Sequence, residues 1–388
     1  MVVIVLFSMV GQIIIDEDDG MDVTLWGPDK LTGELVEKQI FITPKDGHTY
    51  LTSWLMKRFV YQVETKKIAD RLNELANLAD SLMSSPESSS YQTSYRKKRN
   101  GSFRRIDEPS KELKEYQKSV VKFFEQELKY QHPEGAYAYI KKRNARQAVK
   151  AHSGSNVFFK YDLYNFFPTC TMKSLLDTMA VVYPFCFIDR SIMQRILKAC
   201  MVYYDNEWHL PQGAPSSPFF SNVALVPFDF RMSLYKPTMD KGKYSRFADD
   251  IYLSYETYRR RLYAKNTTKF VLDALKQTNP NFRLNCHKTK IFNTKDGNTK
   301  MLGMTTSHRT GIKYGSKKKQ YLKAELWTFL ADARDGKIWD KKRVASLNGR
   351  LAYAKFIEPE GISRIIKKAE VKSGQNYDTL VKSILYDG

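Results

Sequence analysis

Two adjacent aspartates, Asp249 and Asp250, interrupt a stretch that otherwise has the alternation of half-buried strands. The stretch reads YSRFADDIYLSY (residues 244–255), and its pattern predicts a strand, a turn that carries both carboxylates, and a second strand. Two carboxylates about 4 Å apart repel each other by roughly 4 kcal/mol at an effective dielectric constant near 20. Either protonation of one carboxyl or a bound divalent cation would relieve this repulsion.

A third carboxylate lies near the end of another apolar segment. Asp162 belongs to SNVFFKYDLYNFFPT (residues 155–169), which we expect to be a hydrophobic strand. If the two strands are neighbours, three carboxylates converge on one place. Carboxylate oxygens without His or Cys favour Mg²⁺ or Mn²⁺, and a pair of such ions suits phosphoryl transfer. An isolated Asp-Asp pair, in contrast, is more often a solvated turn.

The charge of the chain indicates an anionic partner. Of its 388 residues, 63 are Lys or Arg and 42 are Asp or Glu, which gives a net charge of +21. Such an excess favours nucleic acid over a membrane, and a merely soluble basic surface is the weaker alternative. The hydrophobic content of 42% is sufficient for a packed core.

The cysteines and the amino terminus bear on the cellular compartment. Cys170, Cys186, Cys200 and Cys286 form no C-x-x-C pair, so we expect neither zinc nor a disulfide framework, but a reduced, cytoplasmic protein. The apolar residues 1–15 are fewer than the roughly 20 that a membrane span needs, and we expect strands there. A start at Met9 or Met21 remains open.

In the rest of the chain, the spacing of apolar residues predicts both strands and helices. We expect short hairpins at 22–56, a linker at 84–90, and a further strand–turn–strand around Asn100-Gly101, which is a strong signal for a tight turn. Strands are also expected at 282–293 and 300–306. The patterns typical of helices cover residues 60–82, 110–130, 173–204, 257–277 and about 320–388. A Pro/Gly/Ser-rich loop at 210–225 is expected to turn into a further helix that ends near Tyr235.

The turn at Asn100-Gly101 is surrounded by basic residues. They are Lys97, Lys98, Arg99, Arg104 and Arg105. So many like charges on one small ribbon repel each other unless a polyphosphate lies against them. A solvated basic edge that prevents aggregation is the alternative reading.

Taken together, the motifs of the chain resemble those of reverse transcriptases. The order and spacing of the family are met by Asp162 in YDLYNFFPT, QGAPSSP (212–218), FADD (247–250), LNCHKTK (284–290) and MLGM (301–304), with FRRIDEPSKELKEYQ (103–117) upstream. The resemblance covers about residues 95–310. Among these enzymes, the chain most resembles the small bacterial retron and antiphage-defence type.

The resemblance implies an α+β right-hand polymerase with an RRM-like antiparallel palm sheet. Its domains would be an N-terminal extension (1–56), fingers (57–156), a palm (157–312) with a helical insertion at about 173–209, and a helical thumb (313–388). The implied activity is RNA-directed DNA synthesis by two-metal nucleotidyl transfer. The implied partners are two Mg²⁺ ions (or Mn²⁺), dNTPs, a structured non-coding RNA template and the DNA product. An effector protein from the same operon is left open, and no membrane is expected.

The resemblance also assigns roles to single residues. Asp162, Asp249 and Asp250 would bind the metal, and Lys288 would protonate the departing pyrophosphate. The incoming nucleotide would contact Arg104, Lys98, the backbone at Leu163, the sugar gate Phe167, Gln212 and Gly213. Primer and template would contact Phe247, Leu302, Gly303, Lys318 and Lys319. A bulky ring at Phe167 would exclude a ribose 2′-hydroxyl and so favour a DNA product.

Some positions depart from the pattern of the family. Phe247 replaces the usual Tyr, Met301-Leu302-Gly303 stands where retron enzymes have Val-Thr-Gly, and NARQAVKAH (144–152) matches their Asn-Ala-x-x-His element only loosely. A non-retron defence enzyme that makes untemplated or protein-primed DNA is therefore an alternative. An RNA polymerase with the same palm, or a protein that only binds nucleic acid, is disfavoured by Phe167 and Ala248 and by the intact aspartates, respectively.

Overall fold

The computed structural model describes residues 2–5, 12–15, 21–28, 35–42, 65–85, 90–98, 101–235, 242–256, 260–293, 299–307 and 311–386. These residues form helices and antiparallel sheets, which confirms the α+β class. Packing divides the chain into two units. The first consists of Met1–Arg143, Lys160–Tyr252 and Arg259–Thr289, and the second of Asn144–Phe159, Leu253–Tyr258 and Lys290–Gly388.

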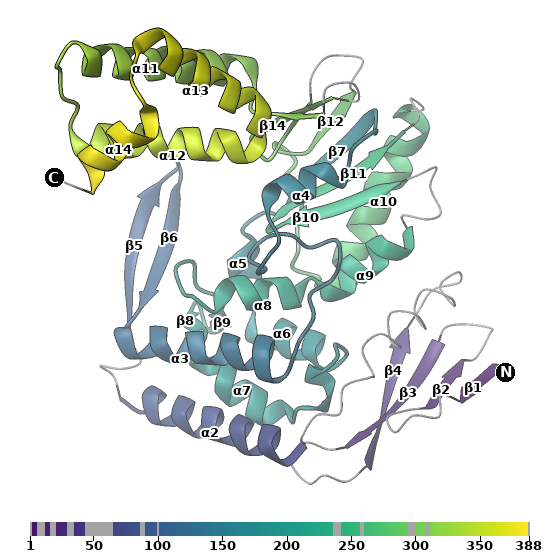
Figure 1. Ribbon diagram of the computed structural model, residues 1–388. Helices are drawn as coiled ribbons and strands as arrows, with labels where there is room; N and C mark the ends of the chain where they lie inside the picture. Colours follow the sequence, from purple (N-terminus) through teal and green to yellow (C-terminus); the bar gives the residue numbers. More distant parts are fainter. Residues whose placement is uncertain are drawn as a thin grey trace. The chain divides into compact units, whose positions relative to one another are not determined.

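Helices make up most of the first unit. Those described are α2 (Thr65–Met83), α3 (Lys111–Lys122), the π-helical η1 (Phe123–Glu127), α5 (Phe166–Thr169), α6 (Met172–Met179), the 3₁₀ turn η2 (Phe185–Phe187), α7 (Arg190–Lys198), α8 (Ser217–Ala224), α9 (Val226–Tyr235) and α10 (Arg260–Thr278). Helix α2 packs on α3 and α7, and α6 packs on α7 and α8 (Figure 1). The helix predicted from residue 110 begins as expected, because the Ser110 side chain accepts a hydrogen bond from the amide of Leu113.

Two-stranded hairpins accompany these helices. In the described residues they pair β1 (Val2–Val5) with β2 (Gln12–Ile15), β3 (Met21–Pro28) with β4 (Leu35–Ile42), β5 (Tyr91–Lys97) with β6 (Phe103–Pro109), and β8 (Val202–Tyr204) with β9 (Glu207–His209). The hairpin predicted at Asn100-Gly101 is confirmed. Gly101 adopts a φ of 86°, which a tight turn requires and which glycine tolerates without steric cost.

The central sheet brings together the two strands that carry aspartates. Its strand order is β10 (Lys243–Phe247), β11 (Asp250–Tyr255), β7 (Val157–Asp162) and β12 (Lys290–Asn293). Strands β7 and β11 run in opposite directions: the amide of Asn156 donates to Tyr255, and that of Leu163 donates to Asp249. The predicted strand–turn–strand and its pairing with the segment of Asp162 are therefore confirmed.

Several predicted boundaries were wrong. Residues 166–169, expected to extend a strand, form α5, because the left-handed Asn165 (φ 47°) ends the extended backbone. The strand expected over 282–293 is confined to β12, since Asn285, Lys288 and Thr289 form a hydrogen-bonded turn. Residues 202–204, expected to be helical, form β8. The start of the helix predicted at 60–82 and most of the 84–90 linker lie outside the described residues.

The second unit combines a small sheet with helices. The sheet contains β13 (Thr299–Met301), β14 (Met304–Ser307) and β15 (Gly311–Lys313), so the single strand expected at 300–306 is in fact a hairpin. Helix α4 (Ala145–Lys150) packs on β14 and β15. The remaining helices described are α11 (Ser316–Arg334), α12 (Lys341–Ile357), α13 (Pro359–Ser373) and α14 (Tyr377–Leu385), which confirm the helical C-terminal region.

The cysteines and the helices can be compared with what the sequence suggested. All four cysteines are free thiols, and only Cys286 is exposed. Within the described ranges, no helix is both long enough and apolar enough to cross a bilayer.

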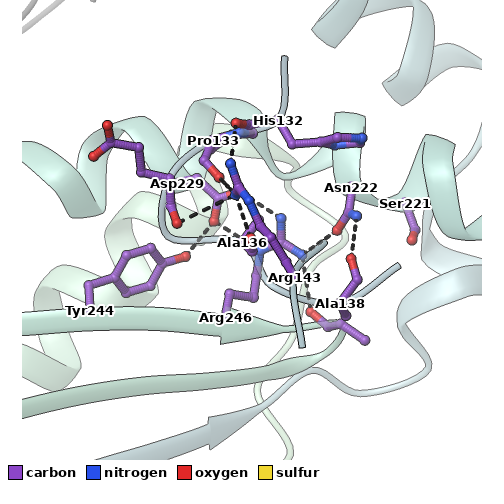
Figure 2. A network of polar contacts seen from close by, with 12 residues as sticks. His132, Pro133, Ala136, Ala138, Arg143, Ser221, Asn222, Asp229, Tyr244 and Arg246 are labelled. Carbon is purple, nitrogen blue, oxygen red and sulfur yellow. Dashed lines mark hydrogen bonds and ion pairs between the residues drawn. The ribbon is translucent and has the colours of Figure 1, made fainter. Parts of the chain in front are cut away.

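A buried polar network fixes the end of strand β10. The Arg246 guanidinium, which is 0% exposed, donates to both carboxylate oxygens of Asp229 in α9 (2.9 and 2.6 Å). Tyr244 donates its hydroxyl to the same carboxylate, and Asn222 in α8 accepts from Arg246 (2.8 Å) (Figure 2). Burial opposes the charge on Arg246, but the Asp229 carboxylate outweighs it and raises the pKa of Arg246 above its ordinary value.

The same network holds the loop that precedes α4. Arg143 donates to the carbonyl oxygens of Pro133 and Ala136, and Asn222 donates to that of Ala138 (2.9 Å) (Figure 2). Residues 135–137 then pair with β10, since the amide of Arg246 donates to Gly135 and that of Tyr137 donates to Arg246. The loop thereby becomes an additional edge of the central sheet.

An aromatic cluster forms the core between η1, η2 and α8. Phe124 is fully buried at its centre, stacks on Phe219 (5.7 Å between centroids) and meets Phe185 edge to face (5.2 Å). Aromatic pairs of this geometry contribute beyond the area that they bury. The core of the first unit therefore depends on this ring.

We expect Phe124→Ala to lower the free energy of unfolding by about 3–5 kcal/mol, because it leaves a cavity in a packed core. Chemical denaturation followed by circular dichroism measures the change. Phe103→Ala is the matched control, since Phe103 is 63% exposed and its loss should cost about 0.5 kcal/mol or less. Equal losses in the two variants would contradict this assignment of the core.

Candidate active site

The backbone places Asp162 and Asp249 at adjoining positions. Asp162 is the last residue of β7, and the next amide, that of Leu163, donates to the carbonyl oxygen of Asp249 (3.1 Å). Asp249 lies in the turn between β10 and β11, and Asp250 begins β11. Two carboxylates from strands that are distant in sequence thus reach one end of the central sheet.

Two lysines neutralise part of this negative charge. Lys288 donates to both carboxylate oxygens of Asp162 (3.0 Å each), and its side chain is 58% exposed. Lys160, two residues before Asp162 on β7, pairs with Asp250 Oδ1 (2.7 Å). Its ammonium also lies 5.6 Å from the centre of the Tyr252 ring. Asp249 has neither of these lysines as a direct partner.

The surroundings of the turn disfavour the ionised forms of the Asp249 and Asp250 carboxyl groups. Burial raises the pKa of Asp249, and the charges of Asp250 and Asp162 raise it further. Burial also raises the pKa of Asp250 and Asp162 adds to this, while Lys160 acts in the opposite direction. These shifts are those expected of carboxylates that lack a sufficient counter-charge.

The donor set fits a hard divalent cation. Asp162, Asp249 and Asp250 offer only carboxylate oxygens, as Mg²⁺ and Mn²⁺ prefer. Among the described residues, however, no three His, Cys, Asp or Glu side chains are already arranged to hold a metal ion together. The carboxylates of Asp162 and Asp250 are paired with their lysines instead. Convergence of the strands is thus established, and ligation by the three aspartates stays a prediction.

The basic hairpin presents one exposed pair of arginines. Arg96 and Arg104 lie directly opposite each other in β5 and β6, both are exposed, and neither forms an ion pair with a described residue. Arg105 is engaged internally, because it binds Asp107 (2.8 Å) and lies over the Tyr204 ring (4.0 Å). Lys98 is half-buried at the end of the ribbon.

The loop that carries Gln212 and Gly213 contacts this hairpin. The amide of Asp107 donates to the carbonyl oxygen of Gln212 (2.8 Å). Gly213 adopts a φ of 132°, and a Cβ there would lie 2.8 Å from the carbonyl oxygen of Asp107. A glycine is therefore required by both backbone conformation and space.

The other first-unit residues that were predicted to contact the nucleotide or the primer differ in how accessible they are. Phe167 is half-buried in α5 beside the buried Phe166, so part of its ring is accessible. Phe247 is half-buried at the end of β10. The amide of Leu163 donates to the carbonyl oxygen of Asp249, because sheet pairing continues through this residue. Contact between the backbone at Leu163 and the triphosphate stays a prediction.

The predicted primer residues of the second unit form one hydrogen-bonded turn. Leu302 (φ 49°) and Gly303 (φ 78°) make the tight turn between β13 and β14. Lys318 donates to the carbonyl oxygen of Gly303 (2.9 Å). Lys319 is paired with Glu358 (2.7 Å), which leaves Lys317 and Lys323 as exposed charges nearby on α11.

Sequence reasoning missed several residues around the aspartates. Lys160 is the one basic residue of the otherwise mostly apolar strand VFFKYD, and this anomaly was a usable signal. Tyr139 is 52% exposed with a left-handed φ of 61°. Burial and the charge of Asp249 raise its pKa, whereas Arg104 lowers it. Its neighbours could not be inferred from the sequence.

Comparison with known families shows which family the chain belongs to. A sequence profile described as reverse transcriptase (RNA-dependent DNA polymerase) matches residues 95–306, which is more than half of the 388-residue chain. The chain belongs to the reverse transcriptase family. The match includes β7, the turn of Asp249 and the loop of Gln212. Reverse transcriptases generally use divalent metal ions, in agreement with the donor set.

Curated relatives place this reverse transcriptase among bacterial enzymes. The chain is 26% identical to the retron Ec83 reverse transcriptase of Escherichia coli over 313 residues, which are 77% of this chain and 94% of that enzyme. It is 26% identical to the retron Ec73 reverse transcriptase of Escherichia coli over 302 residues, 74% of this chain and 89% of that enzyme. The chain is thus an RNA-directed DNA polymerase of the retron type.

A more distant likeness exists among solved structures. The telomerase of Candida albicans, in complex with a TWJ fragment of telomeric RNA, has a TM-score of 0.40 and 12% identity. The match covers 76% of this chain and 61% of the telomerase chain. A likeness of this degree carries no conclusion about the reverse transcriptase.

We expect Asp249→Asn to stabilise the metal-free protein at neutral pH by about 0.5–1 kcal/mol, as removal of a functional, electrostatically strained group does. The raised pKa means that ionisation of Asp249 destabilises the fold above the ordinary pKa of an aspartate. As the pH falls through the folded-state pKa, the wild type is protonated and the advantage of the variant should vanish. Denaturation in a chelator at several pH values measures this. A destabilised variant at neutral pH would contradict the electrostatic argument.

Proposed function

We propose that this reverse transcriptase makes DNA on an RNA template with Asp162 and Asp249 as the principal ligands of Mg²⁺ and Asp250 beside them. Mn²⁺ is expected to substitute. When bound, such cations would lower the pKa of the primer 3′-hydroxyl and neutralise charge on the triphosphate. Lys288 would leave Asp162 on cation binding, and its exposed ammonium could then protonate the departing pyrophosphate.

The observation that carries this proposal is the hydrogen bond from the amide of Leu163 to the carbonyl of Asp249 (3.1 Å). It supports a common site for two carboxylates that the sequence separates. The raising of the pKa of Asp249 by Asp250 and Asp162, after burial, supports a need for further positive charge. Neither feature is expected of a solvated turn.

The hairpin and its contact loop would bind the incoming dNTP. Arg104 offers a planar donor fork suited to phosphate oxygens, and Arg96 opposite adds a second. Gln212 and Gly213 would lie under the nascent base pair, where only a glycine permits close approach of the backbone. Lys98, at the end of the hairpin, would add a positive charge for binding the triphosphate.

The nucleic-acid contacts would be divided between the two units. Phe247 would stack near the primer end, and the turn of Leu302 and Gly303 would hold the primer through its backbone. Lys318, with the neighbouring charges of α11, would contact phosphates of the hybrid without reading the sequence. We retain the proposed fingers (57–156), palm (157–312) and thumb (313–388), with the extension at 1–56.

The biological setting is proposed from resemblance. The names of the relatives support a retron, and hence a structured non-coding RNA as template in the cytoplasm. A role in antiphage defence, with an effector protein from the same operon, is proposed on the same basis. Sequencing of the nucleic acid that copurifies with the chain tests this setting, and DNA attached to protein instead of RNA would contradict it.

We expect the wild type to incorporate dTTP on poly(rA)/oligo(dT) with Mg²⁺, and Asp249→Asn to lose at least about 10³-fold in rate, because a ligand of the catalytic cation is lost. Radiolabelled primer extension measures both. Asp273→Asn is a suitable control, since this residue is exposed on α10 and has no part in the proposed site. Incorporation by Asp249→Asn near the wild-type rate would exclude the proposed site.

We expect Phe167→Ala to weaken discrimination against ribonucleotides by roughly 10- to 100-fold, because its ring would no longer collide with a 2′-hydroxyl. The ratio of kcat/KM for dTTP and UTP is the measurement. Phe166→Leu controls for loss of packing, since Phe166 is buried and cannot act as a gate. An unchanged ratio in Phe167→Ala would assign Phe167 to the core alone.

A further inference from the structure

The turn that carries Asp249 has a conformation that requires an external constraint. Ala248, immediately before Asp249, adopts a left-handed φ of 55°. For a residue with a Cβ this conformation is unfavourable, because the Cβ comes close to the following carbonyl oxygen. Such strain persists only where the surroundings enforce it, and it is typical of functional sites.

The surroundings that enforce it are hydrogen bonds to two successive carbonyl groups. Arg246 Nη1 donates to the carbonyl oxygen of Ala248 (3.2 Å), and Leu163 donates its amide to that of Asp249 (3.1 Å). The first bond comes from a side chain and the second from the neighbouring strand. The path of the backbone through Asp249 is thereby fixed on both sides.

Arg246 can hold the turn because it is itself held by several partners. Its Nε and Nη2 bind the two oxygens of Asp229, and its Nη1 also donates to Asn222 Oδ1 (2.8 Å) (Figure 2). Arg246 and Asp229 are both almost completely buried, at 0% and 2% exposure. A planar guanidinium that makes this many directed bonds has one available orientation.

We propose that Arg246, oriented by Asp229, is the positioning residue that sets the Ala248–Asp249 turn for nucleotidyl transfer. It acts through geometry, since its bond to the turn goes to a backbone carbonyl and not to a reacting group. The inference rests on the proposed function, because it takes Asp249 as a ligand of the catalytic cation. It adds a residue that none of the sequence motifs had singled out.

The decisive variant is Arg246→Lys, which keeps the positive charge but loses the fork. We expect kcat for single-nucleotide addition to fall roughly 10- to 100-fold, as a displacement of about 1 Å in a reacting group does. KM for dTTP and the Kd for the primer–template should stay within about threefold, because no substrate contact is removed. Assays are run where circular dichroism shows each variant to be folded.

A matched control separates positioning from general stability. Arg143 belongs to the same network but donates to the carbonyl groups of Pro133 and Ala136, not to the turn. Arg143→Met should lower the thermal midpoint while keeping kcat within about threefold at a temperature where it is folded. A loss of kcat in Arg143→Met equal to that in Arg246→Lys would overturn the proposal.

A second substitution tests the turn itself. Ala248→Gly removes the Cβ that makes the left-handed φ costly. In the Arg246→Lys background it should restore kcat at least about threefold without restoring the thermal midpoint, because only the turn is relieved. If Arg246→Lys does not fold, the isosteric Asp229→Asn takes its place, with the same expected loss of kcat and the same rescue by Ala248→Gly.

The outcomes distinguish this inference from the function on which it rests. Full activity of Asp249→Asn on the same template would refute the proposed function. Loss of activity in Asp249→Asn, together with a kcat for Arg246→Lys within about threefold of the wild type, would refute only the positioning role. Absence of rescue by Ala248→Gly would likewise count against it.

Discussion

The ion pair between Arg246 and Asp229 is the interaction on which the geometry of the central sheet depends. Both side chains are removed from water, and neither charge is tolerable in the interior without the other. The pair therefore ties β10 to α9 and, through Asn222, to α8. Arg246 therefore links the turn after β10 to α8 and α9, two helices that lie earlier in the chain.

The candidate active site is consistent with a balance between attraction and repulsion of charge. Three aspartates and two lysines meet at one end of the sheet, so the pairs at Asp162 and Asp250 leave Asp249 as the least compensated carboxylate. Burial and the neighbouring carboxylates therefore make ionisation of Asp249 unfavourable.

The arginines of the basic hairpin have different surroundings. Arg105 contacts Asp107 and Tyr204, whereas Arg96 and Arg104 form an exposed, like-charged pair. The bond from Asp107 to Gln212 holds the ribbon against the loop of Gln212 and Gly213. The exposed pair is then available to an anion, in agreement with the proposed contact between Arg104 and the triphosphate.

The amino-acid sequence alone predicts the local features of this protein. Which charged side chains contact each other could be seen only in the folded structure. Alternation and apolar runs predicted the strands of Asp162 and Asp250, Asn100-Gly101 predicted the hairpin, and the order of motifs indicated the family before any contact was known. These features depend on neighbours within a few residues, which a linear pattern contains. The helix at 166–169 was missed, because a single left-handed residue at Asn165 changes the direction of the chain.

The partners of the buried and half-buried charges became known only from contacts in space. In the sequence, Arg246 and Lys160 are basic residues within strand segments, and nothing nearby identifies what they bind. Arg246 binds Asp229 from another element, and Lys160 binds Asp250 across the sheet. The strength of such a bond depends on burial and on distance in space, and neither quantity is contained in the local order of residues.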